Sequence, residues 1–142
     1  MLGLFLIVTL FLAPTLPFAS TTNSSTNCIL AYQWHVSVTS NLPDDMILNI
    51  HGPDFHQKLT LSPGNKFGWH FCQLGRVYLG EVIWGSMNTT VVLYNDHIKK
   101  FCSRIKIGTQ HCYWLVTTDG FYVSRHNSPF PDSNWHFERP WG

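Results

Sequence analysis

The side chains that could carry chemistry in this chain are four cysteines and eight histidines. Cys102, His111, Cys112 and His97 stand close enough together to suggest a zinc site. However, neither the Cys-x-x-Cys spacing nor the His-x-x-x-His spacing of zinc motifs occurs in the chain. In an oxidising compartment the two cysteines would form a disulfide instead. We therefore expect no metal site and no cofactor.

The histidines could also pair with serine and carboxylate side chains to make a nucleophilic site. No Gly-x-Ser-x-Gly elbow or comparable motif surrounds any of them. We expect most of the histidines to lie on the surface or at strand ends. His70 alternates with the aromatic residues of its own strand and should point away from them. The chain is therefore expected not to be an enzyme.

The segment after Cys112 predicts the elements that position these side chains. Residues 113–118 have the alternation and β-branched content of a half-buried strand, and Asp119-Gly120 is typical of a tight turn into a second strand at residues 121–123. With Cys102 upstream, this segment resembles a hairpin stapled by a disulfide. Such a disulfide would place the chain outside the cytosol.

The rest of the chain predicts more strands and no helical pattern longer than two turns. Residues 41–45 predict a turn that joins two strands into a hairpin, residues 85–88 predict a loop, and residues 97–107 are ambiguous. The expected fold is all-β, a small antiparallel β-sandwich of two sheets with disulfides and at most one short helix. Strands are expected around Trp34, Val36 and Val38, at residues 46–51 and 58–61, around Phe67, Trp69 and Phe71, and at residues 76–84 and 89–95.

The amino terminus predicts a secretory signal. Residues 2–13 are almost continuously apolar and uncharged, and they end at Pro14 before the small residues Ala19 and Ser20. The run is shorter than the ~20 apolar residues that span a bilayer; a buried core helix is the alternative. We expect a signal peptide at 1–20, a flexible mature terminus at 21–33, one domain at 34–142 and no stable membrane anchor.

Charge does not select the partner. Lys and Arg total 9 against 8 acidic residues, and no run of like charges exceeds two, so we expect neither nucleic acid nor an anionic membrane as a partner. Aromatic residues make up 15% and charged residues 12% of the chain, which is too apolar for disorder. The domain is expected to be a monomer.

Two sequons support secretion. Asn23-Ser24-Ser25 and Asn88-Thr89-Thr90 both fit the acceptor pattern for N-glycosylation, with no proline in the middle position. Asn23 falls in the polar stretch before the domain, and Asn88 is expected in a turn between two strands. The alternative is a chance match that carries no glycan.

A series of short segments carries a family resemblance over residues 34–123. In order and spacing, these segments resemble the plant self-incompatibility S1 family, also called S-protein homologues. The resemblance implies a small secreted β-sandwich that acts as an extracellular signalling ligand. In the founding members, made by the poppy stigma, a transmembrane protein of pollen recognises the ligand. The segments are residues 36–42, Ile50-His51, residues 67–71, Trp84, residues 92–94, Cys112-Tyr113-Trp114 and residues 119–122.

The chain departs from that family at two cysteine positions. Family members usually have a cysteine after the histidine that matches His51 and another four residues before the tryptophan that matches Trp84. Here these positions are Gly52 and Gly80. If the two cysteines form one bridge in relatives, their joint loss removes a crosslink without leaving an unpaired thiol. The acidic segment that usually follows the first cysteine is also missing.

Four cysteines allow three pairings, and the sequence alone does not choose among them. The favoured pairing joins Cys102 to Cys112 and Cys28 to Cys72. The first of these bridges is the part of the family's cysteine framework that this chain keeps. In the alternative, Cys72 is a buried free thiol.

Three functions remain open, and the first is favoured. The first is a ligand for an unknown cell-surface receptor, recognised through loops at residues 42–45, 53–57, 85–88 and 97–110. The second is a carbohydrate or cell-wall binding module that uses exposed aromatic residues such as Trp135, Phe137 and Trp141. The third is a secreted hydrolase. The strand tryptophans Trp34, Trp69, Trp84 and Trp114 are expected in the core.

Overall fold

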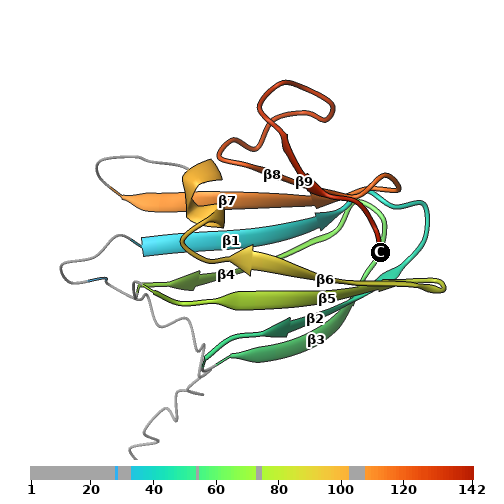
Figure 1. Ribbon diagram of the computed structural model, residues 1–142, viewed down its shortest axis with the longest axis horizontal. Helices are drawn as coiled ribbons and strands as arrows, with labels where there is room; N and C mark the ends of the chain where they lie inside the picture. Colours follow the sequence, from blue (N-terminus) through green and yellow to red (C-terminus); the bar gives the residue numbers. More distant parts are fainter. Residues whose placement is uncertain (1–27, 29–32, 54, 73–74, 103–107) are drawn as a thin grey trace, which may run out of the picture.

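The protein is a sandwich of two β-sheets (Figure 1). The computed structural model describes residue 28 and residues 33–53, 55–72, 75–102 and 108–142. Its elements are β1 (Gln33–Ser40), β2 (Met46–His51), β3 (His56–Leu61), β4 (Lys66–Phe71), β5 (Tyr78–Trp84), β6 (Met87–Tyr94), the 3-10 turn η1 (Ile98–Phe101), β7 (Thr109–Val116), β8 (Phe121–Ser124) and β9 (His136–Arg139).

Five strands form one sheet in the order β4-β1-β7-β8-β9, and four form the other in the order β3-β2-β5-β6. All neighbouring pairs are antiparallel except β1 and β7, which run parallel. The described residues contain no α-helix, only η1. The predicted all-β sandwich of two sheets is confirmed, with one parallel pair that the sequence did not predict.

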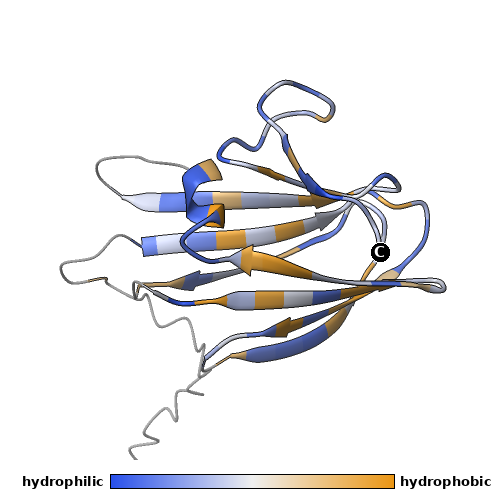
Figure 2. Cartoon of the chain, viewed as in Figure 1, coloured by the Kyte–Doolittle hydropathy of each residue, from blue (hydrophilic) through white to orange (hydrophobic). Residues whose placement is uncertain are grey.

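The core lies between the two sheets, where alternate side chains of each strand meet. Figure 2 shows hydrophobic residues alternating with polar ones along the strands of both sheets. Trp114 of β7 is 1% exposed, and its Nε1–H donates a 2.8 Å hydrogen bond to the carbonyl of Leu93 in β6. This bond links the two layers directly. Of the four tryptophans expected in the core, Trp34, Trp69 and Trp114 are buried, whereas Trp84 packs at the edge of the core and is half-buried.

The hairpin predicted between β1 and β2 is wrong, because the two strands lie in different sheets. The chain turns at Asn41, whose N–H donates to the carbonyl of Val116, and Leu42 is then buried in the core at 3% exposure. Burial of Leu42 draws the connection across the end of the sandwich, so β2 begins in the opposite layer. Both strands alternate in the same way, so their pattern alone could not exclude direct pairing.

Both favoured disulfides are present. Cys28 is bonded to Cys72 and Cys102 to Cys112, with Cα–Cα distances of 5.2 and 4.7 Å. The predicted β7–β8 hairpin forms, with its turn at Asp119 and Gly120. However, β7 begins at Thr109, so Cys112 lies inside the strand rather than at a corner before it. The second disulfide therefore fastens the residue after η1 to the inner face of β7.

The carboxyl-terminal segment, which the sequence did not predict to be a strand, completes the five-stranded sheet as β9 and then closes one side of the sandwich. The Arg139 Nη1–H donates to the carbonyl of Thr90 in the other sheet, over 2.7 Å. Trp141 donates from Nε1 to the carbonyl of Thr117, and its ring packs against Phe121 at 4.8 Å between centroids. The end of the chain therefore bridges both layers.

Neighbouring side chains fill the space beside Gly52 and Gly80. A Cβ atom at Gly80 would lie 2.6 Å from Cδ1 of Leu93, and one at Gly52 would overlap the ring of Tyr78. Gly80 of β5 is paired with Ile50 of β2, and Gly52 follows directly after the end of β2 at His51. Leu93 and Tyr78 therefore occupy the space that a side chain at Gly80 or Gly52 would need.

Gly80→Ala is therefore expected to destabilise the protein by about 1–3 kcal/mol, because the added methyl overpacks the core against Leu93. Urea unfolding of the two proteins measures this difference. Combining the change with Leu93→Val, which removes the contacting Cδ1 atom, should cost less than the sum of the two single changes. If the two losses of stability add exactly, the contact with Leu93 is not the cause of the destabilisation by Gly80→Ala.

Candidate recognition surface

A hollow opens at one end of the sandwich, where several connections meet. It has a volume of about 590 Å³ and is lined by residues of the β1–β2, β3–β4 and β5–β6 connections and of the end of β5: Pro43, Asp44, Asp45, Pro63, Trp84 and Gly85. Loops held by a rigid β scaffold are a common place for binding residues. This hollow is therefore our candidate recognition surface.

Short-range contacts fix the loops around the hollow. The buried side chain of Leu42 holds the β1–β2 connection, and its N–H lies 3.4 Å from the hydroxyl of Ser40. The N–H of Gly64 donates to the carbonyl of Ser40, which ties the β3–β4 turn to the same place. Gly85 has φ of 58°, a conformation that glycine adopts at little cost. The rim is thus built on a preformed backbone.

Trp84 forms part of the wall of the hollow and is held from behind. Its ring lies 5.7 Å from that of Trp141, which in turn packs against Phe121. Trp141 is therefore a supporting residue, and its half-buried ring is not free for stacking on a sugar. One face of Trp84 is left to line the hollow.

The hollow has an acidic and aromatic character. Asp44 and Asp45 are both exposed, and none of the lining residues is basic. Carboxylates beside an indole face suit a cationic group, which gains charge pairing and a cation–π contact together. The chain as a whole has a formal net charge of +1, so this acidic character is local.

The loops predicted for recognition divide between the two ends of the sandwich. Residues 42–45 and 85–86 meet at the hollow. The β2–β3 connection follows His51, at the opposite end of β2, and η1 follows β6 at that same far end. Asp54 and residues 103–107 lie outside the described residues. The sequence could nominate these loops but could not tell which of them would meet.

The glycosylation candidates are placed only in part. Asn88 is exposed, but it lies in β6 and not in the turn, which is confined to Gly85 and Ser86. Asn23 and the expected signal peptide at 1–20 lie outside the described residues, as does most of the expected flexible segment at 21–33.

The exposed aromatic residues of the carboxyl-terminal segment do not form a flat platform. Phe137 is 44% exposed, but its ring meets that of Tyr122 edge to face at 65°. Phe130 meets Tyr122 at 65° and Trp135 at 75°. These rings form a small cluster that joins β8 and β9 to Phe130 and Trp135 of the connection between them, and their planes are steeply inclined to one another rather than aligned in one flat surface.

A row of three histidines, which the sequence did not predict, crosses the outer face of the five-stranded sheet. His35 of β1 is paired with His70 of β4 and with His111 of β7, and its ring lies 4.4 and 5.5 Å from theirs. His70 faces away from the aromatic residues of β4, as expected. A Cβ atom at Gly68 would lie 2.6 Å from His35 Nε2, so this glycine makes room for the ring. The parallel pairing of β1 with β7 creates the row.

Burial, together with the neighbouring His70, His111 and Lys66, lowers the pKa of His35 to about 4, and burial is the largest of these causes. The pKa of His111 is also lowered, first by burial and then by His70. Both imidazoles are therefore held in their neutral form in the folded protein at neutral pH.

Acid should weaken the fold through this row. Between pH 6.5 and 4 the unfolded chain binds a proton at His35 that the folded protein does not. The contribution of His35 to stability is therefore constant above about pH 6.5 and falls as the pH drops toward 4. Because His35 is partly exposed, we expect a loss of about 1–2 kcal/mol, less than the full pKa shift implies. Urea unfolding measures the free energy of unfolding at pH 7.5 and at pH 4. The loss between the two pH values should be smaller for His35→Gln than for the wild type. Equal losses would show that His35 is not the group responsible.

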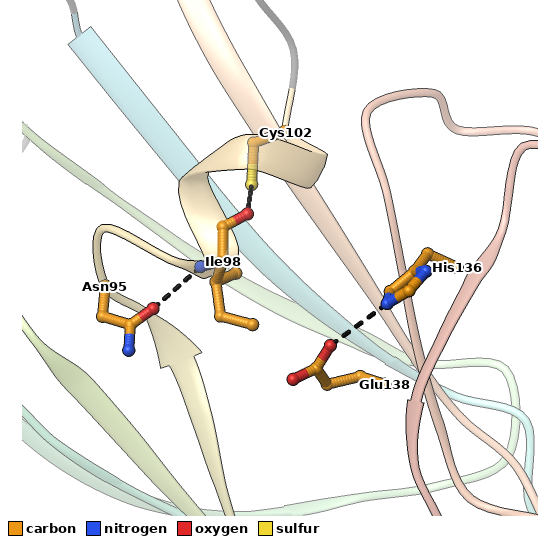
Figure 3. Close-up of polar contacts among 5 residues, drawn as sticks. All are labelled: Asn95, Ile98, Cys102, His136 and Glu138. Atoms are coloured by element: carbon orange, nitrogen blue, oxygen red, sulfur yellow. Dashed lines mark hydrogen bonds and ion pairs between the residues drawn. The ribbon is translucent and has the colours of Figure 1, made fainter.

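A histidine–carboxylate pair lies on β9, where His136 Nε2 is 3.3 Å from Glu138 Oε2 (Figure 3). The ring of His136 also stacks on Phe101 of η1 at 3.9 Å between centroids. Among the described residues, no hydroxyl side chain bonds to His136, so the pair lacks the nucleophile of a catalytic triad. Its contacts instead fasten β9 to η1.

Figure 3 also shows how η1 is held. The Ile98 N–H donates to Oδ1 of Asn95 over 2.8 Å. Cys102 Sγ lies 3.4 Å from the carbonyl oxygen of Ile98, but a disulfide sulfur carries no proton, so we interpret this as a packing contact.

Across the residues that the structure describes, no group of three or more histidine, cysteine or acidic side chains is arranged to hold a metal ion. No helix in that part of the chain is long and apolar enough to cross a membrane. The disulfides indicate an oxidising, extracellular type of environment.

Comparison with protein-family models, with curated proteins and with solved structures finds no match to this chain.

Proposed function

We propose that the protein is a secreted, non-enzymatic signalling ligand of the S-protein homologue type, recognised by a cell-surface receptor. The observation that carries the proposal is the hollow, where connections at one end of a disulfide-braced sandwich meet beside Trp84. A small rigid scaffold that presents loops at one end suits recognition of a protein surface.

The glycine positions also support the proposal. Gly52 and Gly80 stand where S-protein homologues usually have cysteines. Gly80 lies in β5 opposite Ile50 of β2, and Gly52 directly follows β2. Here Leu93 and Tyr78 take up the space, which fits a divergent member of that family.

The acidic rim favours a partner with a basic side chain. Asp44 and Asp45 would pair with a lysine or arginine of the receptor, and Trp84 would cover its aliphatic stem or its charged head. The carbohydrate alternative finds less support, because Trp141 is engaged in the fold and Phe137 meets Tyr122 edge to face.

Charge reversal at the rim tests this function. Purified, labelled protein is added to intact target cells and surface binding is measured; Asp45→Lys is expected to weaken binding by about tenfold or more, since like charges then face each other. Asp96→Lys is the matched control: it makes the same change of charge at an exposed residue at the far end of β6 and should bind as the wild type does. Equal loss with both variants would indicate that only bulk charge matters.

A further inference from the structure

β6 is an outer strand of the four-stranded sheet and needs protection. Its partner on one side is β5, and within the described part of the chain no strand pairs with its other side. Its eight residues, Met87–Tyr94, contain no charge and no proline and are rich in threonine, valine and aromatic or aliphatic side chains. Such a strand is a template for pairing with a second chain unless something blocks it.

One contact shows which backbone groups face the free side. The carbonyl of Thr90 accepts the hydrogen bond from Arg139 Nη1, so it is not used in the ladder with β5. In an antiparallel pair, the N–H and C=O groups of alternate residues point to the same side. The backbone groups of Asn88 and Val92 therefore point outward with those of Thr90.

The carboxyl-terminal segment covers only the middle of this edge. Arg139 occupies the carbonyl of Thr90, and the N–H of Gly142 donates to the hydroxyl of Thr89 over 2.9 Å. Asn88 lies beyond these contacts and is exposed, next to Met87, which is 40% exposed. The start of β6 is thus an open part of the edge.

The side chain of Asn88 also faces a small apolar surface. Asn88 is paired with Ile83 of β5, which is paired with Ile47 of β2, so the three side chains form one row on the outer face of the sheet. Both isoleucines are only partly buried. Asn88 is at once the free end of this row, a residue of the open edge and the acceptor residue of a sequon.

We propose that an N-glycan on Asn88 guards this edge, blocking a second copy of the chain from pairing along β6 and covering the row of Ile83 and Ile47. The inference rests on the secretion proposed above. In the transfer, Asn88 Nδ2 loses a proton and bonds to C1 of an oligosaccharide, while the bond from C1 to its lipid-diphosphate carrier breaks and the lipid diphosphate leaves. The bulky, hydrated glycan would prevent edge-to-edge pairing, as a lysine does on other edge strands.

The test compares secreted wild type with three variants, using mass before and after glycosidase treatment and sedimentation velocity over a range of concentrations. Asn88→Gln should lose one glycan mass and self-associate at a concentration about tenfold or more below that of the wild type. Asn23→Gln, which removes the other sequon, should stay monomeric. Asn88→Lys, which restores protection by charge without a glycan, should also stay monomeric.

Trimming the glycans of folded wild type to their first sugar provides a second route, should Asn88→Gln be poorly secreted, and is expected to promote the same self-association. An unchanged mass in Asn88→Gln, or a monomer for that variant and for the trimmed protein at every concentration, would overturn the proposal. These measurements do not involve receptor binding. The glycan proposal can therefore be wrong while the hollow still binds a receptor, and it can be right while the hollow binds none.

Discussion

Replacing Trp114 by alanine should lower the free energy of unfolding by about 4–5 kcal/mol, among the largest effects of any single change in this chain. Trp114 is 1% exposed, so its removal leaves a large cavity between the sheets. The carbonyl of Leu93 would also lose its partner. Because small domains are stable by only about 5–15 kcal/mol, the variant should be close to unfolding at room temperature. Urea unfolding followed by far-ultraviolet circular dichroism measures the loss.

Trp114→Phe is the control that separates packing from the hydrogen bond. Phenylalanine keeps most of the apolar volume but leaves the carbonyl of Leu93 unpaired, and it should cost about 1–3 kcal/mol. A loss as large as that of the alanine variant would mean that the bond between the layers, rather than packing, dominates. A negligible loss in both variants would contradict the core described above.

Removing the disulfide between Cys28 and Cys72 should cost about 4 kcal/mol. The bridge spans 44 residues, and a loop of this length loses much entropy when it is closed in the unfolded chain. The comparable figure for Cys102 and Cys112, separated by 10 residues, is about 3 kcal/mol. The measurement is the free energy of unfolding of Cys28→Ser with Cys72→Ser against the wild type under non-reducing conditions.

The single variants Cys28→Ser and Cys72→Ser serve as controls for this bridge. Each breaks the same crosslink, so each should lose about as much stability as the double variant. A double variant within about 1 kcal/mol of the wild type would show that the bridge adds little to the fold.

Local patterns were sufficient to predict most strands. The alternation of Trp34, Val36 and Val38, and of Phe67, Trp69 and Phe71, correctly separates the core side from the outer side of β1 and β4. The pattern reports which face of a strand is buried, and a series of such strands along the chain with no helical pattern between them favours an all-β sandwich.

Pairing between distant strands could not be predicted in this way. The parallel pairing of β1 with β7 joins residues more than seventy positions apart, such as Gln33 and Thr109, and no local signal marks it. The histidine row depends on that pairing and was missed with it. β9 was missed because it follows a proline-rich connection and only one of its four residues, Phe137, is apolar.

The candidate site was predicted only in part, because it too depends on contacts between segments that are distant in the sequence. Residues 42–45 could be nominated from their turn composition, and residues 85–88 from their glycine and serine. Their meeting around Trp84 depends on the crossing of the chain after Leu42 into the other sheet. Because tryptophan in a strand usually indicates core, no local pattern pointed to Trp84 at a surface hollow.

The most direct test of the proposed receptor function is site-specific photocrosslinking on intact target cells. A photoreactive group is introduced at Ser86, which is exposed beside the hollow, and in a second protein at Lys100, which is exposed in η1 at the opposite end. We expect the group at Ser86 to label one membrane protein, with labelling competed by unmodified ligand and absent with the group at Lys100. Equal labelling from both positions, or labelling from Lys100 alone, would contradict recognition through the hollow.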